Sequence, residues 1–353
     1  MKAALAAIAL IAALAPAGLT SSPALADATQ DFADCKGSNH DAIIPACTRL
    51  LAANKLTGQS LQDALYYRSN EYIGRSDWDN ALADAQKCVA IAPNDTDCVN
   101  QVGRAYHGQS DYNNALVYFQ KTVEINPKYT SGWANIGVTY NAKGNYDQAI
   151  EAYTKAIQLD PKYSFAYSSR GDAWSSKEEY KKAIQDYSKS ILLEPSNTYS
   201  LGGRAYSYRV LGQYDKANDD VGKAVAIDPS YAYGYGVIAL INHDQGKFRK
   251  TKEALDKAIG LNDHTAWYYA YRGNAETMLG QYDSARADLG KANELATNYI
   301  EANYFLGLLN EKTKKKKDAI DAYRASLVSS ATTTEARQAQ QKSIKRLAVL
   351  NAN

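Results

Sequence analysis

The sequence contains few of the patterns that mark metal centres, catalytic nucleophiles or nucleic-acid surfaces. The four histidines, His40, His107, His243 and His264, show no metal-binding spacing, and the four cysteines form no Cys-x-x-Cys pair. No glycine-rich phosphate loop is present. The 40 basic and 38 acidic side chains are interspersed and leave a net charge of only +2. We therefore expect no enzyme activity, no metal, no other cofactor and no nucleic-acid partner.

Long apolar runs are also scarce, and the one at the start of the chain is short. Met1 and Lys2 precede an apolar stretch that begins at Ala3, and small residues follow at positions 24 and 26. This arrangement is typical of a cleaved secretory signal, residues 1–26, so we expect cleavage after Ala26 and a periplasmic or secreted product. No later stretch reaches about eighteen apolar residues, so we expect no transmembrane span.

Export gives the four cysteines a role, because an even number of cysteines in an oxidising compartment is normally paired. Three pairings are possible. The local solution joins Cys35 to Cys47 and Cys88 to Cys98. The alternative is that the cysteines are free thiols that pack as small apolar side chains.

Proline is scarce, but its placement is regular. Of the eight prolines, five follow one another at intervals of 34 residues: Pro93, Pro127, Pro161, Pro195 and Pro229. Proline cannot continue a helix, because it lacks the amide donor and clashes with the preceding turn. A period of 34 residues therefore predicts a solenoid built from helix-turn-helix units.

One 34-residue segment shows which family the units resemble. Residues 130–163 carry Trp133, Gly137, Tyr140, Ala149 and Pro161 at characteristic places, and the segment closely resembles the tetratricopeptide repeat. The resemblance implies an all-α, right-handed α-solenoid of eight repeats, numbered one to eight from the N-terminus. These repeats are 62–95, 96–129, 130–163, 164–197, 198–231, 232–265, 266–299 and 300–333.

Both ends of the array are expected to be covered, because a terminal unit otherwise exposes its stacking face. Residues 27–61 form an N-terminal cap in which only the second helix of a repeat is expected, over 44–51. Residues 334–353 form a C-terminal capping helix. Thr332 and Glu335 suggest a capping box at its start, and Ile344, Leu347 and Leu350 suggest its apolar face.

A row of arginines in the first helix of four repeats has two interpretations. The same four repeats carry aspartate sixteen residues later, whereas the other four carry an apolar residue in place of arginine and no aspartate. We expect bidentate ion pairs within the repeats rather than an anion-binding ladder. The expected pairs are Arg68–Asp84, Arg170–Asp186, Arg204–Asp220 and Arg272–Asp288.

The resemblance also implies which residues line the concave face, namely the second, fifth, ninth and twelfth of each repeat. In repeats four to seven these positions predict an aromatic peptide-binding groove, with small fifth-position residues such as Gly202 and Gly236 leaving room for a ligand. The predicted groove residues are Phe165, Tyr199, Tyr206, Arg209, Tyr233, Leu240, His243, Trp267 and Asn274. A secondary patch comprises Tyr66, Asn70, Asn100, Arg104 and His107. The alternative is that the aromatic rings only pack neighbouring helices together.

The expected function is that of a non-enzymatic interaction scaffold of the bacterial cell envelope that binds a peptide or partner protein in this groove. Two alternatives stay open. Aromatic rings also stack on sugars, so the groove could bind a cell-wall or exopolysaccharide glycan. The chain could instead be a structural component of an envelope or secretion assembly, engaged through its edges and caps.

Overall fold

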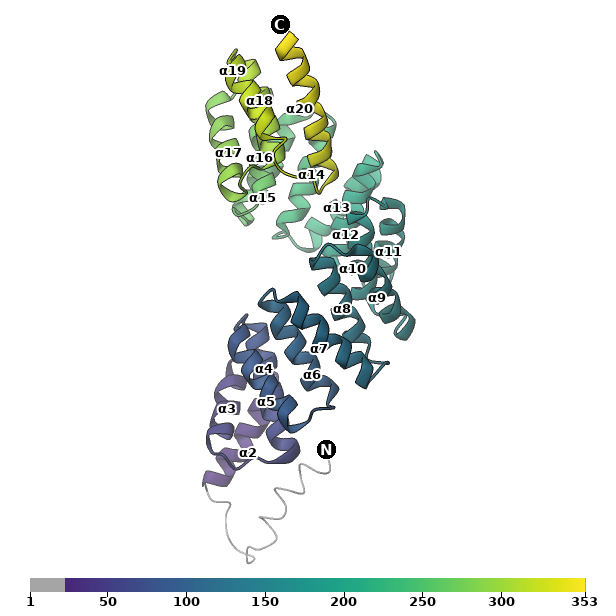
Figure 1. Ribbon diagram of the computed structural model, residues 1–353, viewed down its shortest axis with the longest axis vertical. Coiled ribbons are helices and arrows are strands. Elements are labelled where there is room, and N and C mark those ends of the chain that lie inside the picture. Colours follow the sequence, from purple (N-terminus) through teal and green to yellow (C-terminus); the bar gives the residue numbers. More distant parts are fainter. Residues whose placement is uncertain (1–22, 353) are drawn as a thin grey trace, which may run out of the picture. The chain divides into compact units, whose positions relative to one another are not determined.

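The structure is a computed structural model that describes residues 23–352, and every regular element in these residues is an α-helix (Figure 1). The chain divides into two bodies at Pro161 and Lys162. The N-terminal body contains α2 (Pro23–Cys35), α3 (His40–Ala52), α4 (Gly58–Gly74), α5 (Trp78–Ile91), α6 (Thr96–Gly108), α7 (Tyr112–Ile125), α8 (Thr130–Ala142) and α9 (Tyr146–Leu159).

The C-terminal body continues the same alternation of helices. It contains α10 (Ser164–Ser176), α11 (Tyr180–Leu193), α12 (Thr198–Val210), α13 (Tyr214–Ile227), α14 (Ala232–Asp244), α15 (Phe248–Leu261), α16 (Ala266–Met278), α17 (Tyr282–Leu295), α18 (Ile300–Lys312), α19 (Lys316–Ala325) and α20 (Thr334–Ala352). Within each body, consecutive helices pack against one another, so the predicted all-α solenoid of helix pairs is confirmed.

The turn inside each repeat has a recurring geometry. In all eight repeats the fifteenth residue has a positive φ angle, and four of these eight residues are glycines, such as Gly144 at 75°. The backbone amide of Gly144 donates to Asn141, and that of Asn145 donates to Tyr140 at 2.9 Å. This pattern of hydrogen bonds ends the first helix and sends the chain into the second.

Small residues allow the two helices of a repeat to approach closely. A Cβ atom on Gly137 would lie 2.6 Å from the ring of Tyr153, and one on Gly171 would lie 2.9 Å from Tyr187. The facing alanines of the second helices, including Ala149 and Ala183, are fully buried. A larger side chain at either position would force the paired helices apart.

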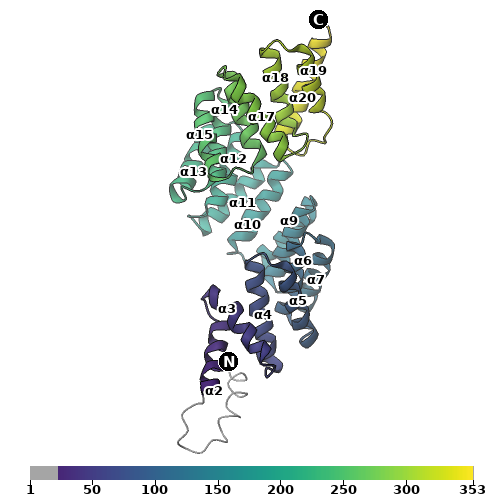
Figure 2. The same cartoon turned by 90° about the vertical axis from the view of Figure 1, so that its left-hand side faces the viewer.

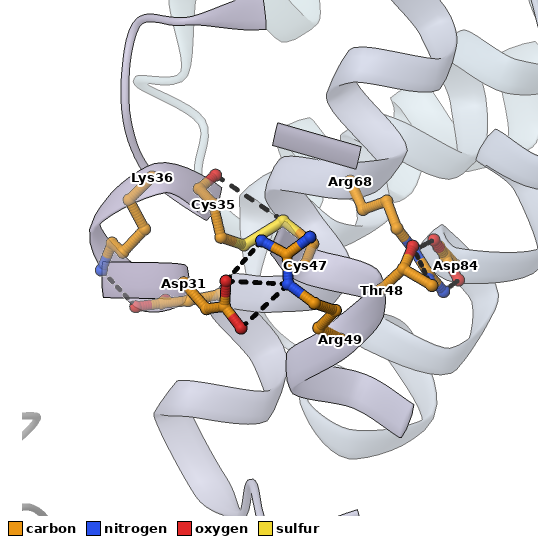
Figure 3. Close-up of a disulfide and its surroundings, with 9 residues drawn as sticks. Asp31, Cys35, Lys36, Cys47, Thr48, Arg49, Arg68 and Asp84 are labelled. Carbon is orange, nitrogen blue, oxygen red and sulfur yellow. Dashed lines mark hydrogen bonds and ion pairs between the residues drawn. A yellow bond between two sulfur atoms is a disulfide. The ribbon is translucent and has the colours of Figure 1, made fainter. Parts of the chain in front are cut away.

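The N-terminal cap differs from the expectation, because its first helix is present. α2 packs on α3 and α4, so residues 23–52 form a helix pair rather than a lone second helix. A disulfide between Cys35 and Cys47 joins α2 to α3, and Figure 3 shows it beside the Asp31–Arg49 ion pair. A second disulfide joins Cys88 to Cys98, and no described cysteine is free. The first helix was missed because its sequence lacks the spacing of the repeats.

The C-terminal capping helix also departs from the expectation at its start. The hydroxyl oxygen of Thr333, not Thr332, accepts a hydrogen bond from the backbone amide of Ala336 at 3.1 Å. α20 lies beside α18 and α19 (Figure 2), and buries Ala336, Ala339 and Ser343. Of the predicted apolar face, Leu347 and Leu350 are half-buried, whereas Ile344 is exposed and Ser343 is buried in its place.

Candidate functional site

The arginine row belongs to the scaffold and not to a ligand site. In all four repeats the arginine donates through Nε and Nη2 to both carboxylate oxygens of the aspartate sixteen residues later, at 2.6 to 2.9 Å. The four aspartates are at most 8% exposed, so each pair is largely desolvated. Arg68, Arg204 and Arg272 also use Nη1 to reach the preceding helix, as Arg204 does with Ser188 at 2.9 Å.

The candidate site is a pair of cavities on the helices of the C-terminal body. The first has a volume of about 500 Å³ and the second of about 230 Å³, and both are lined by Tyr206 and Tyr233. We call the two cavities together the tyrosine groove. The first is also lined by Asp172, Ser175, Ser176, Tyr187, Tyr199, Gly203 and Tyr231. The second is also lined by Leu240, Trp267, Tyr271, Tyr299, Glu301, Thr333 and Glu335.

Asp172 is the charged residue of the first cavity. The hydroxyl groups of Tyr187 and Tyr199 each donate a hydrogen bond to its carboxylate at 2.6 Å. Burial raises the pKa of Asp172 to about 6, although these two hydrogen bonds act in the opposite direction. Asp172 is the ninth residue of repeat four, so the position rule applied to the groove also identifies it, although it was not among the predicted residues.

The start of α20 closes one side of the second cavity. The carboxylate of Glu335 accepts hydrogen bonds from Tyr206 at 2.9 Å and from Arg209 Nη1 at 2.7 Å. Arg209 also donates through Nε to Asp244 at 2.7 Å. Burial opposes the charge of Arg209, but the hydrogen bond and charge of Asp244 outweigh it, so the pKa of Arg209 is raised. Arg209 is therefore engaged by two carboxylates of its own chain.

The other predicted groove residues divide into exposed and buried groups. Phe165 and Tyr199 are 45% and 54% exposed, whereas Leu240 and Asn274 are buried. His243 Nε2 lies 2.7 Å from Asn274 Nδ2, and its ring packs against Tyr271. His243 and Asn274 therefore join neighbouring repeats, and neither lines the tyrosine groove.

The room expected at the small fifth-position residues is occupied by the chain itself. A Cβ atom on Gly202 would lie 2.5 Å from the hydroxyl of Tyr231, and one on Gly236 would lie 2.7 Å from the ring of Tyr268. Gly202 therefore admits a side chain from the end of its own repeat and Gly236 one from the next repeat, so the interpretation that these glycines leave space for a ligand is wrong. Gly203, the neighbour of Gly202 in sequence, lines the first cavity, but neither Gly202 nor Gly236 lines either cavity.

The secondary patch lies in the N-terminal body and is a hydrogen-bond network. Asn70 Oδ1 accepts hydrogen bonds from Arg104 at 2.8 Å and from Gln101 at 3.1 Å. Asn100 accepts one from Asn135 at 2.9 Å, and His107 Nδ1 lies 3.1 Å from the hydroxyl of Thr139. Burial lowers the pKa of Arg104 and of His107, while Tyr66 is half-buried nearby. The patch joins successive first helices.

Besides Asp172, two acidic residues line the groove without having been predicted as groove residues, Glu301 and Glu335. Glu301 is the second residue of repeat eight and is 5% exposed, and burial raises its pKa to about 7. Glu301 occupies the same second position of its repeat as Tyr199, Tyr233 and Trp267 do in theirs. The repeat period therefore identifies it as a groove position. Glu335 comes from outside the repeats, so no periodicity marks it.

The described helices include none that is both long and apolar enough to cross a membrane. Models of the tetratricopeptide repeat match residues 97–129, 131–163 and 272–336. No curated relative matches significantly.

Among solved structures, a chain of the APC/C hetero-tetramer Cut9-Hcn1 is similar over 92% of this chain, with a TM-score of 0.63 and 20% identity. This chain spans 64% of the length of that chain. A tetratricopeptide repeat protein from Parabacteroides merdae ATCC 43184 is similar over 81% of this chain and 100% of its own, with a TM-score of 0.52 and 16% identity. The three family matches show that the chain contains tetratricopeptide repeats, and the likeness to these structures shows that it has the same kind of helical fold.

Proposed function

We propose that this protein is a non-enzymatic scaffold that binds an extended peptide segment of a partner protein in the tyrosine groove. Tetratricopeptide repeats in general build scaffolds for protein–protein interaction, and their stacked helices offer long curved surfaces. The peptide would contact Tyr199 and Tyr233, which line the first cavity.

The observation that carries the proposal is the number of tyrosines around one cavity. Five tyrosines line the first cavity: Tyr187, Tyr199, Tyr206, Tyr231 and Tyr233. Tyrosine offers a large contact area with few rotatable bonds, so little conformational entropy is lost when a partner binds. A volume of about 500 Å³ lies within the range of ligand-binding cavities.

We also propose that the protein acts in the bacterial cell envelope or outside the cell. Two features support this location. The apolar segment 3–14, which lies outside the described residues, is typical of a secretory signal. Both pairs of cysteines lie at disulfide distance, and disulfides persist in oxidising compartments. Fractionation of the native cells, with thiol titration of the denatured but unreduced protein, tests this location.

The function is tested by affinity capture from an extract of the native organism. The test variant combines Tyr199→Ala and Tyr233→Ala, which remove two rings of the first cavity. The matched control combines Leu192→Ala and Ile227→Ala, which are 72% and 47% exposed and line neither cavity. Circular dichroism checks that both variants are folded. We expect a protein partner that the wild type and the control retain and the test variant loses. A partner retained equally by all three proteins would refute the proposal.

A further inference from the structure

The first cavity of the tyrosine groove holds a carboxylate that has no basic partner. The hydrogen bonds to the Asp172 carboxylate come from tyrosine hydroxyl groups, and no lysine, arginine or histidine of the described chain pairs with it. The linings of both cavities contain Asp172, Glu301 and Glu335 but no basic side chain. Arg209, which is not part of either lining, forms an ion pair with Glu335. Among the described residues, Asp172 and Glu301 have no such positively charged partner.

A half-buried carboxylate without a counter-charge is costly for the folded protein. Water solvates a carboxylate better than a cavity lined by aromatic rings does, so the charged form is disfavoured unless a cation approaches it. The raised pKa of Asp172 reflects this cost. Near neutral pH the group is still mainly ionised, and a ligand that brings a positive charge would gain the missing attraction.

The tyrosine rings around Asp172 suit the same kind of ligand. The face of an aromatic ring attracts a cation within about 6 Å, and the attraction is strongest where water is excluded. Tyr187 and Tyr199 direct their hydroxyl hydrogens to the carboxylate, so the lone pairs of their oxygens stay available to accept from an ammonium or guanidinium group. Tyr231 and Tyr233 contribute two more rings, which meet edge to face at 6.0 Å.

We propose that the first cavity is a subsite for the lysine or arginine side chain of the bound peptide, with Asp172 as its anionic partner and the surrounding tyrosines as its aromatic cage. The inference rests on the proposed function and specifies its ligand. An acidic side chain would meet the charge of Asp172 unfavourably, and the hydroxyl groups of a neutral sugar would leave that charge uncompensated. The charge of the cavity therefore favours a basic residue.

The inference is tested with immobilised protein and four mixtures of synthetic octapeptides. The central residue of each mixture is lysine, arginine, norleucine or glutamate, and the other positions are randomised. The test variant Asp172→Asn removes the charge at nearly constant size; its amide oxygen accepts from one tyrosine hydroxyl and its amide nitrogen donates to the other. The control variant Asp215→Asn removes an exposed charge of α13 outside the cavity lining. Thermal unfolding checks each variant, and Asp172→Ser serves if Asp172→Asn does not fold.

We expect the wild type and Asp215→Asn to retain the lysine and arginine mixtures roughly tenfold more than the norleucine mixture. For Asp172→Asn this preference should disappear. Equal retention of all mixtures by the wild type, or an unchanged preference in Asp172→Asn, would overturn the inference. Retention of cellohexaose by the wild type without any lysine preference would also overturn it and would assign the cavity to a neutral glycan.

The two proposals fail in different ways. If the groove binds peptides without charge preference, the norleucine mixture is retained as well as the lysine mixture, and retention falls when Tyr199 and Tyr233 are replaced by alanine. The inference is then wrong and the proposed function stands. If replacing those tyrosines changes nothing in the affinity capture, the proposed function is wrong as well.

Discussion

The intact buried ion pair of repeat five should add little to the free energy of unfolding compared with an apolar pair. Removing only one of its two partners should lower that free energy strongly. Arg204 donates to Asp220 at 2.6 and 2.7 Å, and the side chains of Arg204 and Asp220 are only 17% and 5% exposed. Replacing Asp220 by alanine leaves the guanidinium largely buried without its partner. Breaking a buried pair costs about 3 to 5 kcal/mol, and we expect about 3 kcal/mol, because the guanidinium keeps some contact with water.

The chain itself supplies the matched replacement. Repeat six carries Ile238 and Ala254 where repeat five carries Arg204 and Asp220. The double variant Arg204→Ile, Asp220→Ala therefore imports an apolar pair that the same fold already uses. Because no charge is left unpaired, we expect the double variant to lie within about 1 kcal/mol of the wild type. Asp219→Ala, at an exposed neighbouring position, is the control and should change stability by less than about 0.5 kcal/mol.

Urea denaturation followed by circular dichroism gives the free energy of unfolding. Amide hydrogen exchange in α12 and α13 locates the loss within repeat five. The reasoning requires that the single variant Asp220→Ala be clearly less stable than the double variant. Equal loss in the two variants would show that Asp220 contributes by something other than neutralising Arg204.

Three further predictions concern other parts of the chain. Replacing both Cys35 and Cys47 by serine should destabilise the α2–α3 pair by roughly 3 kcal/mol, seen as faster amide exchange there than in α8; unchanged exchange would mean that the disulfide stabilises nothing. Burial raises the pKa of Glu301 to about 7 in the folded state, from about 4.3 when unfolded. Between these two pH values Glu301 is therefore protonated in the folded protein and ionised in the unfolded one. The free energy of unfolding should then fall by up to about 4 kcal/mol as the pH rises through this window, and Glu301→Gln should flatten the profile; the same slope in wild type and variant would contradict this account. Glu335→Ala should release the first turn of α20 from α12 and raise amide exchange at residues 334–340, while α18 stays protected; protection of both would show that Glu335 does not hold that turn.

Much of the fold follows from local chemistry that recurs every 34 residues. The prolines, the small residues such as Gly137 and the arginine–aspartate pattern report interactions inside one repeat, where the partners are close in sequence. Their geometry can therefore be inferred without knowing the whole structure. The register of the helix pairs, each with its turn at the fifteenth residue, is of this kind.

The parts that sequence did not predict depend on contacts between distant segments. Glu335 reaches Tyr206 and Arg209, which are more than a hundred positions away, and no repeat pattern signals that contact. Gly202 was interpreted as open space, because its occupant, Tyr231, comes from the following turn. Asp172 could have been predicted from its ninth position, but its lack of a basic partner is visible only in the structure.

The central claim, that the tyrosine groove is the partner-binding surface, is tested most directly by photocrosslinking in the native organism. A benzophenone amino acid is placed at Tyr199, which lines the first cavity, and separately at Leu192, which is exposed on α11 and lines neither cavity. We predict a specific protein adduct from position 199 that is absent from position 192. Adducts from position 192 alone, or none from position 199, would contradict the account.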